Sequence, residues 1–294
     1  MLNQWKIRLQ KNPWINSLQK SRSTELDKST NHPNWVAFEP SLVPPLSLMR
    51  LEGISILEEW FRWAEEWSML LRIYGGITPK SKVLEIGCGL GRIAFPLRYI
   101  LTSAGSYDGF EICQEKVNFL EQTFHQTYPN FRFIWANLHN TFYNPAGQIN
   151  AQDYRFPYED NHFDLVFAAS VFTHLLPNVA AHYFQETSRV LKPSGKAVFS
   201  FFLLDYYRRG QPRPGGFAYP IFNCDYSYDS YGDEFAIAEP NNPEFITAYR
   251  RDLIQRFADQ AGLKLAQDPI PGFWSGTVEN WVGTQDLIVL QKRS

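Results

Sequence analysis

The sequence predicts an α/β protein with a doubly wound, mostly parallel sheet and helices on both faces. Two observations support this fold class. Short apolar runs rich in β-branched and aromatic residues alternate along the chain with amphipathic stretches of helical spacing. In addition, residues 83–91 (Val-Leu-Glu-Ile-Gly-Cys-Gly-Leu-Gly) have the pattern of a strand that ends in a tight glycine turn, with an amphipathic stretch after it. Strands that alternate with helices in this way are typical of parallel sheets.

The expected elements follow one another from this region to the C-terminus. The expected strands are 83–86, 107–111, 131–136, 163–169, 197–204 and 287–290. The expected helices are 54–74, 92–101, 114–127, 179–191 and 250–261. Gly262 follows the last helix as its C-terminal cap. Two connections, 138–162 and 205–247, are unusually long, and long loops in compact domains tend to be functional or mobile.

The segment before the first strand is expected to be an extension that carries one amphipathic helix. In 54–74, apolar residues such as Trp60 and Trp67 recur at spacings of three and four and form one face. Two interpretations stay open, a helix packed on the core and a lid over the active site. The expected domains are 1–74 for the extension and 75–294 for the remainder, which holds insertions at 138–162 and 205–247.

Composition and charge indicate an ordinary globular protein and do not favour a nucleic-acid partner. Of the 294 residues, 44% are hydrophobic and 16% aromatic, and the net charge of −2 gives no footprint for a nucleic-acid backbone. We expect no membrane partner and no signal peptide, because no apolar run has the required length or position. The three scattered cysteines form neither a disulfide framework nor a metal spacing, which favours the reducing cytoplasm.

The glycine turn differs from the dinucleotide-binding fingerprint in two respects. That fingerprint places its third glycine three residues after the second, where this chain has Arg92. Glu85, just before the turn, would repel a pyrophosphate but suits a ligand with an ammonium group. Glu111 ends the second expected strand, where an acid accepts hydrogen bonds from ribose hydroxyls. S-adenosylmethionine combines an ammonium, a ribose and an adenine, and it is the expected cofactor.

With these features the chain resembles the class I S-adenosylmethionine-dependent methyltransferases. The matching motifs are Glu85-x-Gly87-x-Gly89-x-Gly91, Asp108-Gly109-Phe110-Glu111, Phe163-Asp164-Leu165-Val166 with Ser170–Leu175, and Glu186-x-x-Arg189 through Gly195. They cover roughly residues 75–205. The resemblance implies a Rossmann-like sheet of seven strands, with an insertion after the fifth strand.

The resemblance also implies which residues bind the cofactor. These are Glu85, Gly87, Cys88, Gly89, Gly91, Glu111, Ile112, Asn137, Leu138 and Ser170. Glu85 would orient the methionine end, and Glu111 would hold the ribose. Asn137 would lie near the adenine, with Asp153 as the alternative. Ser170 would lie under the sulfonium.

The acceptor side is expected to need alignment more than acid–base chemistry, because methyl transfer is an in-line displacement on an activated carbon. If the acceptor arrives protonated, His174 is the first candidate for a base and Asp205 the second. A structural histidine satisfied by backbone groups is the other interpretation of His174. Aromatic residues crowd 201–231, and they form either an acceptor pocket or a cap on the core. The expected substrate-binding residues are Tyr206, Tyr219, Tyr226 and Trp60.

The sequence therefore predicts metal-independent methyl transfer to a small-molecule acceptor. The run Ala169-Ser170-Val171-Phe172 lacks the motif of nucleic-acid amino-methyltransferases and the acid of magnesium-dependent catechol-type enzymes. We expect O-methylation of a hydroxyl or carboxyl on a glycan or a specialised metabolite. Three alternatives stay open: an N-methyltransferase on a small amine or peptide, an NAD-dependent oxidoreductase, and a catalytically silent cofactor-binding protein. The sequence gives no indication of the oligomeric state.

Overall fold

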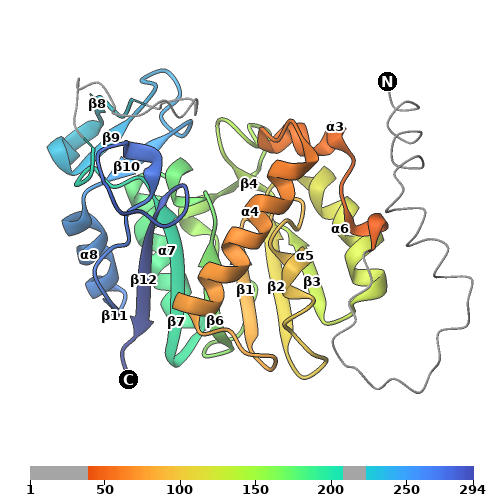
Figure 1. Cartoon of the computed structure of the whole chain (residues 1–294). Helices are drawn as coiled ribbons and strands as arrows, with labels where there is room; N and C mark the ends of the chain where they lie inside the picture. Colours follow the sequence, from red (N-terminus) through yellow and green to blue (C-terminus); the bar gives the residue numbers. More distant parts are fainter. Residues whose placement is uncertain (1–38, 208–222) are drawn as a thin grey trace, which may run out of the picture. The chain divides into compact units, whose positions relative to one another are not determined.

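The predicted seven-stranded sheet is present in the computed structural model, which describes residues 39–207 and 223–294 (Figure 1). Its strands are β1 (Lys82–Ile86), β2 (Ser106–Glu111), β3 (Phe131–Trp135), β6 (Phe163–Ala168), β7 (Leu191–Phe201), β11 (Leu263–Leu265) and β12 (Asp286–Lys292). They lie in the order β11-β12-β7-β6-β1-β2-β3. β12 pairs antiparallel with β7 and β11, and the other pairs are parallel.

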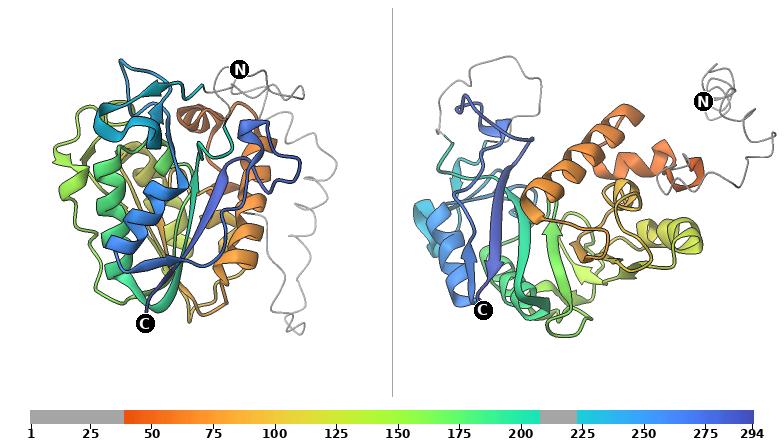
Figure 2. Two further views of the ribbon diagram at one scale, coloured as in Figure 1. Left: turned by 90° about the vertical axis from the view of Figure 1, so that its left-hand side faces the viewer. Right: turned by 60° about the horizontal axis from the view of Figure 1, so that its bottom comes forward.

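Helices cover both faces of this sheet, as the sequence predicts (Figure 2). One face packs against α4 (Leu57–Leu70), α5 (Ala94–Leu97) and α6 (Gln114–Thr127), and the other against α7 (Pro177–Val190) and α8 (Arg251–Gln260). Four short turns flank α4 and complete the described part of the N-terminal region. They are η1 (Pro40–Leu42), α3 (Leu46–Met49), η2 (Arg50–Glu52) and the π-helical η3 (Leu71–Gly75).

The central strands are buried on both faces, which explains their nearly continuous apolar sequences. In β1, Val83, Leu84 and Ile86 are each fully buried, and the only charged residue among the last four is Glu85. Fully burying one such side chain contributes about 1.5–3 kcal/mol. A buried acid in this strand works against that gain, so its presence points to a role beyond folding.

Helix α4 packs on the sheet through the apolar face that its spacing predicts. Trp60, Ala64 and Trp67 are buried there, and the Trp60 ring lies 5.2 Å from that of Phe95 at 68°. Core packing is therefore one function of α4. The boundaries at 74 and 75 and the action of this helix as a lid remain predictions.

Two expected elements differ in extent from those observed. The helix expected over 92–101 is only the single turn of α5, which contains Pro96, a residue without a backbone N–H. The strand expected from residue 197 already begins at Leu191 as β7. Its register with β6 shifts by a bulge, in which Ser194 takes φ +63°.

The two long connections contain strands of their own. Within 138–162, β4 (Leu138–His139) pairs with β5 (Ile149–Asn150), and η4 (Ala151–Asp153) follows. After β7, the chain forms a small antiparallel sheet of β8 (Tyr226–Ser227), β9 (Phe235–Ile237) and β10 (Thr247–Tyr249), with η6 (Asp229–Glu234) between β8 and β9. A last turn, η7 (Phe273–Ser275), precedes β12. Among the helices described, none has the length and apolar character needed to cross a bilayer.

Candidate cofactor and acceptor site

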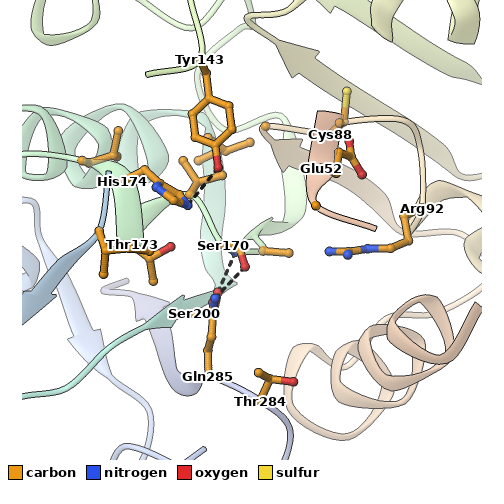
Figure 3. A pocket seen from close by; sticks show the side chains of 18 of the residues that line it. Glu52, Cys88, Arg92, Tyr143, Ser170, Thr173, His174, Ser200, Thr284 and Gln285 are labelled. Atoms are coloured by element: carbon orange, nitrogen blue, oxygen red, sulfur yellow. Dashed lines mark hydrogen bonds between the residues drawn. The ribbon is translucent and has the colours of Figure 1, made fainter. Parts of the chain in front are cut away.

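The order of the strands reverses between β1 and β6, and a cavity of about 790 Å³ opens at this switch point (Figure 3). In open α/β sheets, ligands bind outside the carboxyl ends of strands at such points. The lining follows these ends closely: Glu85 comes from β1, Glu111 from β2, Ser170 follows β6 and Phe202 follows β7. The volume is in the range of small-molecule and cofactor sites.

The glycine turn forms one wall of this cavity. Gly87 and Gly89 take φ of +68° and +54°, a region that side chains strongly disfavour. A Cβ at Gly87 would lie 2.6 Å from Cγ2 of Val171, and one at Gly89 would collide with the Glu52 carboxylate. Cys88 is buried and also lines the cavity. Gly91, in contrast, does not line it and packs against Leu120 of α6.

Glu111 and Glu52 hold the turn from opposite sides. Glu111 accepts hydrogen bonds from the amides of Gly89, at 3.0 Å, and Cys113, at 2.8 Å. Glu52 accepts from the amide of Leu90 at 2.8 Å and pairs with Lys116 at 3.3 Å. Burial alone would lower the pKa of Lys116, but the carboxylates of Glu111 and Glu52 raise it above its ordinary value. Lys116 therefore stays charged between two acids in the wall of the cavity.

Glu85 lies deeper in the same wall and is only 2% exposed. The Tyr107 hydroxyl donates a hydrogen bond to its carboxylate. Burial raises the pKa of Glu85 well above its ordinary value, and the nearby acids Glu52 and Glu111 add to this effect. A cationic group in the cavity would reverse the shift, because it stabilises the ionised carboxylate.

Ser170 lies between the glycine turn and the opposite wall (Figure 3). Its φ of +58° is strained for a residue with a side chain, and such strain concentrates at functional sites. The conformation is held by hydrogen bonds: its amide donates to Ser200 Oγ at 2.8 Å, and Gln285 Nε2 donates to its Oγ at 2.7 Å. Three strand ends distant in sequence thus fix the position of one hydroxyl.

His174 faces the cavity as part of a chain of hydrogen bonds. Nδ1 lies 3.2 Å from the carbonyl oxygen of Glu244, and Nε2 lies 3.2 Å from the hydroxyl of Tyr143. A carbonyl oxygen can only accept, so we assign the proton to Nδ1, and Nε2 then accepts from Tyr143. Burial lowers the pKa of His174 to about 4 and raises that of Tyr143 to about 12. Both side chains are therefore neutral near pH 7.

A sequence model named "Methyltransferase domain" matches residues 84–199, which contain the glycine turn, Glu111, Ser170 and His174. Residues 84–199 are a class I S-adenosylmethionine-dependent methyltransferase domain. Methyltransferases are also found among curated relatives of low identity. A 2-phytyl-1,4-naphtoquinone methyltransferase of Trichormus variabilis is 27% identical over 52% of this chain and 59% of its own length. A sterol 24-C-methyltransferase of Yarrowia lipolytica is 26% identical over 68% of this chain and 47% of its own length.

The methyltransferase domain also matches solved structures at the level of the fold. One is a 1,6-didemethyltoxoflavin-N1-methyltransferase from Burkholderia thailandensis, bound to its substrate and S-adenosylhomocysteine. The identity is 13%, the TM-score is 0.50, and the match covers 84% of each chain. By sequence, the chain spans roughly half the length of the curated relatives it matches, at 59% and 47%.

The cavity of the methyltransferase domain fits S-adenosylmethionine in its chemistry. The positive-φ glycines let a ligand lie against the backbone, because no side chain fills that space. Glu111 keeps lone pairs for hydroxyl groups beside its two amide donors. Glu85 is a buried carboxyl without a cation within ion-pair distance among the described residues, which suits an ammonium. Ile112 and Leu138 also line the cavity, and their apolar side chains suit an adenine ring.

Aromatic side chains dominate the acceptor half of the cavity. They come from the two long connections, the end of β7 and the loop before β12. The rings are Phe142, Tyr143, Phe202, Phe245, Phe273, Trp274 and Trp281. Trp63 and Trp67 add two rings from α4, so this helix both packs on the core and lines the cavity.

Asp286 secures the loop that supplies three of these rings. Its carboxylate is fully buried and accepts from the amides of Leu203 and Gly272, each at 2.7 Å, and from Nε1 of Trp274 at 2.5 Å. Burial raises the pKa of Asp286 to about 7, although all three hydrogen bonds lower it. One buried acid thus ties the end of β7 to the aromatic wall.

Of the expected substrate residues, the three that the structure describes do not line the cavity. Trp60 is fully buried and packs edge-on against the Phe61 and Phe95 rings. Tyr206 donates to the carbonyl of Pro269 at 3.3 Å, and Tyr226 is 52% exposed on β8. Tyr219 lies outside the described residues. The aromatic pocket exists, but other rings form it.

Three further expected residues also lie outside the cavity. The carbonyl of Asn137 accepts from the amides that begin β5, and it is the next residue, Leu138, that lines the cavity. Asp153 is exposed in η4. Asp205 accepts from the amide of Arg251 at 2.8 Å and thereby caps the start of α8.

Sequence reasoning assigned no binding role to several residues that line the cavity. Glu52, Tyr143 and Gln285 lie far from every motif, and only folding brings them to the glycine turn, His174 and Ser170. The long connection that contains Tyr143 was one signal, since such loops tend to be functional. Nothing in the sequence pattern distinguishes Glu52 or Gln285.

Proposed function

We propose that this chain transfers a methyl group from S-adenosylmethionine to an oxygen atom of a small, largely apolar acceptor. One observation carries the proposal: a single cavity joins the glycine turn and Glu111 to the Tyr143–His174 pair and an aromatic wall. Such an arrangement can place a cofactor and an acceptor end to end. Alignment of the two reacting groups is the main catalytic requirement for a displacement of this kind.

The residues of the cavity then take separate roles. The bound cofactor supplies an activated methyl carbon. Gly87 and Gly89 allow the methionine end to lie against the backbone, Glu85 faces its ammonium, and Glu111 accepts from the ribose hydroxyls. Ser170 provides an oriented hydroxyl beside the reacting centre, because Gln285 donates to its oxygen.

We assign His174 a positioning role in place of the catalytic base expected from the sequence. With a pKa near 4 and both ring nitrogens engaged, its imidazole is a weak proton acceptor. It does accept the Tyr143 proton in a hydrogen bond, and this leaves the lone pairs of the Tyr143 oxygen free to accept. Tyr143 would receive a hydrogen bond from the O–H of the acceptor and turn its nucleophilic lone pair toward the methyl group. As the new O–C bond forms and the C–S bond of the cofactor breaks, the acceptor would release its proton to solvent water, and S-adenosylhomocysteine would be the leaving group.

The aromatic wall supports an apolar acceptor more than the glycan suggested by the sequence. Flat or hydrocarbon groups bury well against the rings of residues such as Trp274 and Trp281. The two curated relatives take their names from a phytyl naphthoquinone and a sterol, and both are apolar molecules. A quinol, phenol or hydroxylated isoprenoid is the acceptor class that we propose.

Two measurements test this function. Calorimetry should give micromolar or tighter binding of S-adenosylhomocysteine, and an assay of its release should show turnover with phenols or quinols but not with sugars. NAD in the same titration should give no heat. Absence of S-adenosylhomocysteine binding, or transfer only to amines or carbon, would contradict the proposal.

The Tyr143–His174 pair gives a sharper prediction. Tyr143→Phe removes the accepting oxygen and should lower kcat by about 10- to 100-fold, with unchanged binding of S-adenosylhomocysteine. His174→Asn should lower kcat less, because the phenol stays but loses its orientation. Tyr226→Phe, on exposed β8, is the matched control. If His174 is a base after all, its replacement will cost more than that of Tyr143 and shift the pH profile.

A further inference from the structure

Arg92 is a charged residue of the cavity that the proposed function leaves without a role. It follows the glycine turn directly and lines the cavity. Its Nε is buried and has no hydrogen-bond partner, and within 39–207 and 223–294 no carboxylate lies within 4.0 Å of its guanidinium. A buried donor without a partner is costly, and a cation in such a place more so. The cavity therefore contains a guanidinium without a carboxylate partner among the described residues.

The surroundings of Arg92 orient it and leave its charge unpaired. Its Cζ lies 5.1 Å from the centre of the Trp63 ring, a cation–π distance. The guanidinium extends into the cavity toward Ser170 (Figure 3). The Arg92 charge interacts electrostatically with two acids, Glu85 and Glu66. Burial raises the pKa of each of these carboxyls. Neither forms an ion pair with Arg92, so the space beyond its guanidinium is open to an anionic group.

We propose that Arg92 binds a carboxylate of a ligand in this cavity. A guanidinium and a carboxylate match as a planar, two-point hydrogen-bonded pair, which would satisfy the orphaned Nε. This proposal rests on the proposed function, which places two molecules in the cavity. Because Arg92 lies between the glycine turn and Ser170, the carboxylate belongs either to the methionine end of the cofactor or to the acceptor. A carboxylate on the acceptor would make the substrate an aromatic or isoprenoid acid.

Binding of the cofactor product and of a fragment of it tests whether Arg92 binds the methionine carboxylate of the cofactor. Arg92→Gln should weaken S-adenosylhomocysteine binding by about tenfold or more in calorimetry. The same variant should bind 5′-methylthioadenosine, which lacks the amino-acid group, as the wild type does. Arg92→Lys keeps the charge but not the planar fork, and its affinity should fall between the two. Arg155→Gln, at a 70% exposed arginine that does not line the cavity, is the control and should change neither affinity.

Two probes of the same shape, one an acid and one an alcohol, test whether Arg92 binds a carboxylate of the acceptor. Ligand-observed NMR with 4-hydroxybenzoate and 4-hydroxybenzyl alcohol, with and without S-adenosylhomocysteine, should show preferential binding of the acid to the wild type. Arg92→Gln should abolish that preference and leave the alcohol unaffected. If Arg92→Gln abolishes the preference for the acid but leaves the affinity for S-adenosylhomocysteine unchanged, the carboxylate is that of the acceptor.

The proposal is overturned if Arg92→Gln binds S-adenosylhomocysteine like the wild type and the two probes bind both proteins equally. Thermal melting of each variant shows whether it is folded, and the Arg92→Lys variant gives the same comparison should Arg92→Gln unfold. Failure of the wild type to bind S-adenosylhomocysteine would refute the proposed function. The probe comparison without S-adenosylhomocysteine would still decide the role of Arg92.

Discussion

At the scale of single residues, burial decides what the charged groups of the cavity can do. Glu85 has the same side chain as the exposed acids of α4, yet its position at the end of a fully buried strand raises its pKa well above the ordinary value. The pKa of His174 shifts in the opposite direction for the same reason, because burial disfavours the charged form of any group. For this reason we propose a positioning role for His174, although its residue type suggests a base.

The shifted carboxyl of Glu85 predicts that binding of the cofactor releases protons. The free protein holds a fraction of Glu85 protonated at higher pH than an exposed acid would be, and an ammonium beside it lowers the pKa again. Titration of S-adenosylhomocysteine in buffers of different ionisation enthalpy should therefore reveal proton release at pH values where the Glu85 carboxyl of the free protein is still protonated. Glu85→Gln should remove the release and weaken binding. Equal release by the variant would show that the protons come from another group.

At the scale of elements, the loop between β11 and β12 shows how a buried acid organises an apolar wall. Asp286 begins β12, and its three donors come from the end of β7 and from residues 272 and 274 of the loop. Removing the acid would leave buried amides without partners, which costs about 1–3 kcal/mol for each. The loop that carries Trp274 and Trp281 therefore owes its position to a residue that does not touch the cavity.

Asp286 also predicts a dependence of stability on pH. Its pKa is about 7 in the folded protein against 3.8 as the ordinary value, so between these the folded state binds more protons than the unfolded state. The free energy of unfolding should then fall by about 3 kcal/mol from this group as pH rises from 4 to 7. Asp286→Asn should flatten the fall and weaken acceptor binding, as measured by denaturation at several pH values and by KM. A slope that the substitution leaves intact would assign the titration elsewhere.

At the scale of the whole molecule, the reversal of strand order creates the site. β1 and β6 are neighbours in the sheet, although about eighty residues separate them in the chain, and their carboxyl ends open on one side. The N-terminal η2, the long connections and the loop before β12 all converge on that opening. A ligand in this cavity contacts segments from residue 50 to residue 287 and couples them.

This convergence predicts strong stabilisation by ligand. S-adenosylhomocysteine at 100 times its dissociation constant should add about 2.7 kcal/mol to the free energy of unfolding, because it binds only the folded chain. The melting temperature should rise by several degrees and depend on ligand concentration. Gly89→Ala, whose methyl group would collide with Glu52, should reduce this gain sharply. A melting temperature that ligand leaves unchanged would show that the cavity is not its binding site.

The sequence by itself predicted the fold class, and most of the residues that it suggested for cofactor binding line the cavity, with Gly91 and Asn137 as the exceptions. Strand and helix periodicity, the glycine turn and the acids Glu85 and Glu111 are local signals, since each depends on residues close together in the chain. The acceptor end depended on tertiary structure. Which face of α4 lines the cavity, which rings form the wall, and the pairing of His174 with Tyr143 and of Ser170 with Gln285 all arise from contacts between distant segments. Residue type suggests such partners, but only the packing of the sheet and its insertions sets their distances and their burial, and these determine the chemistry.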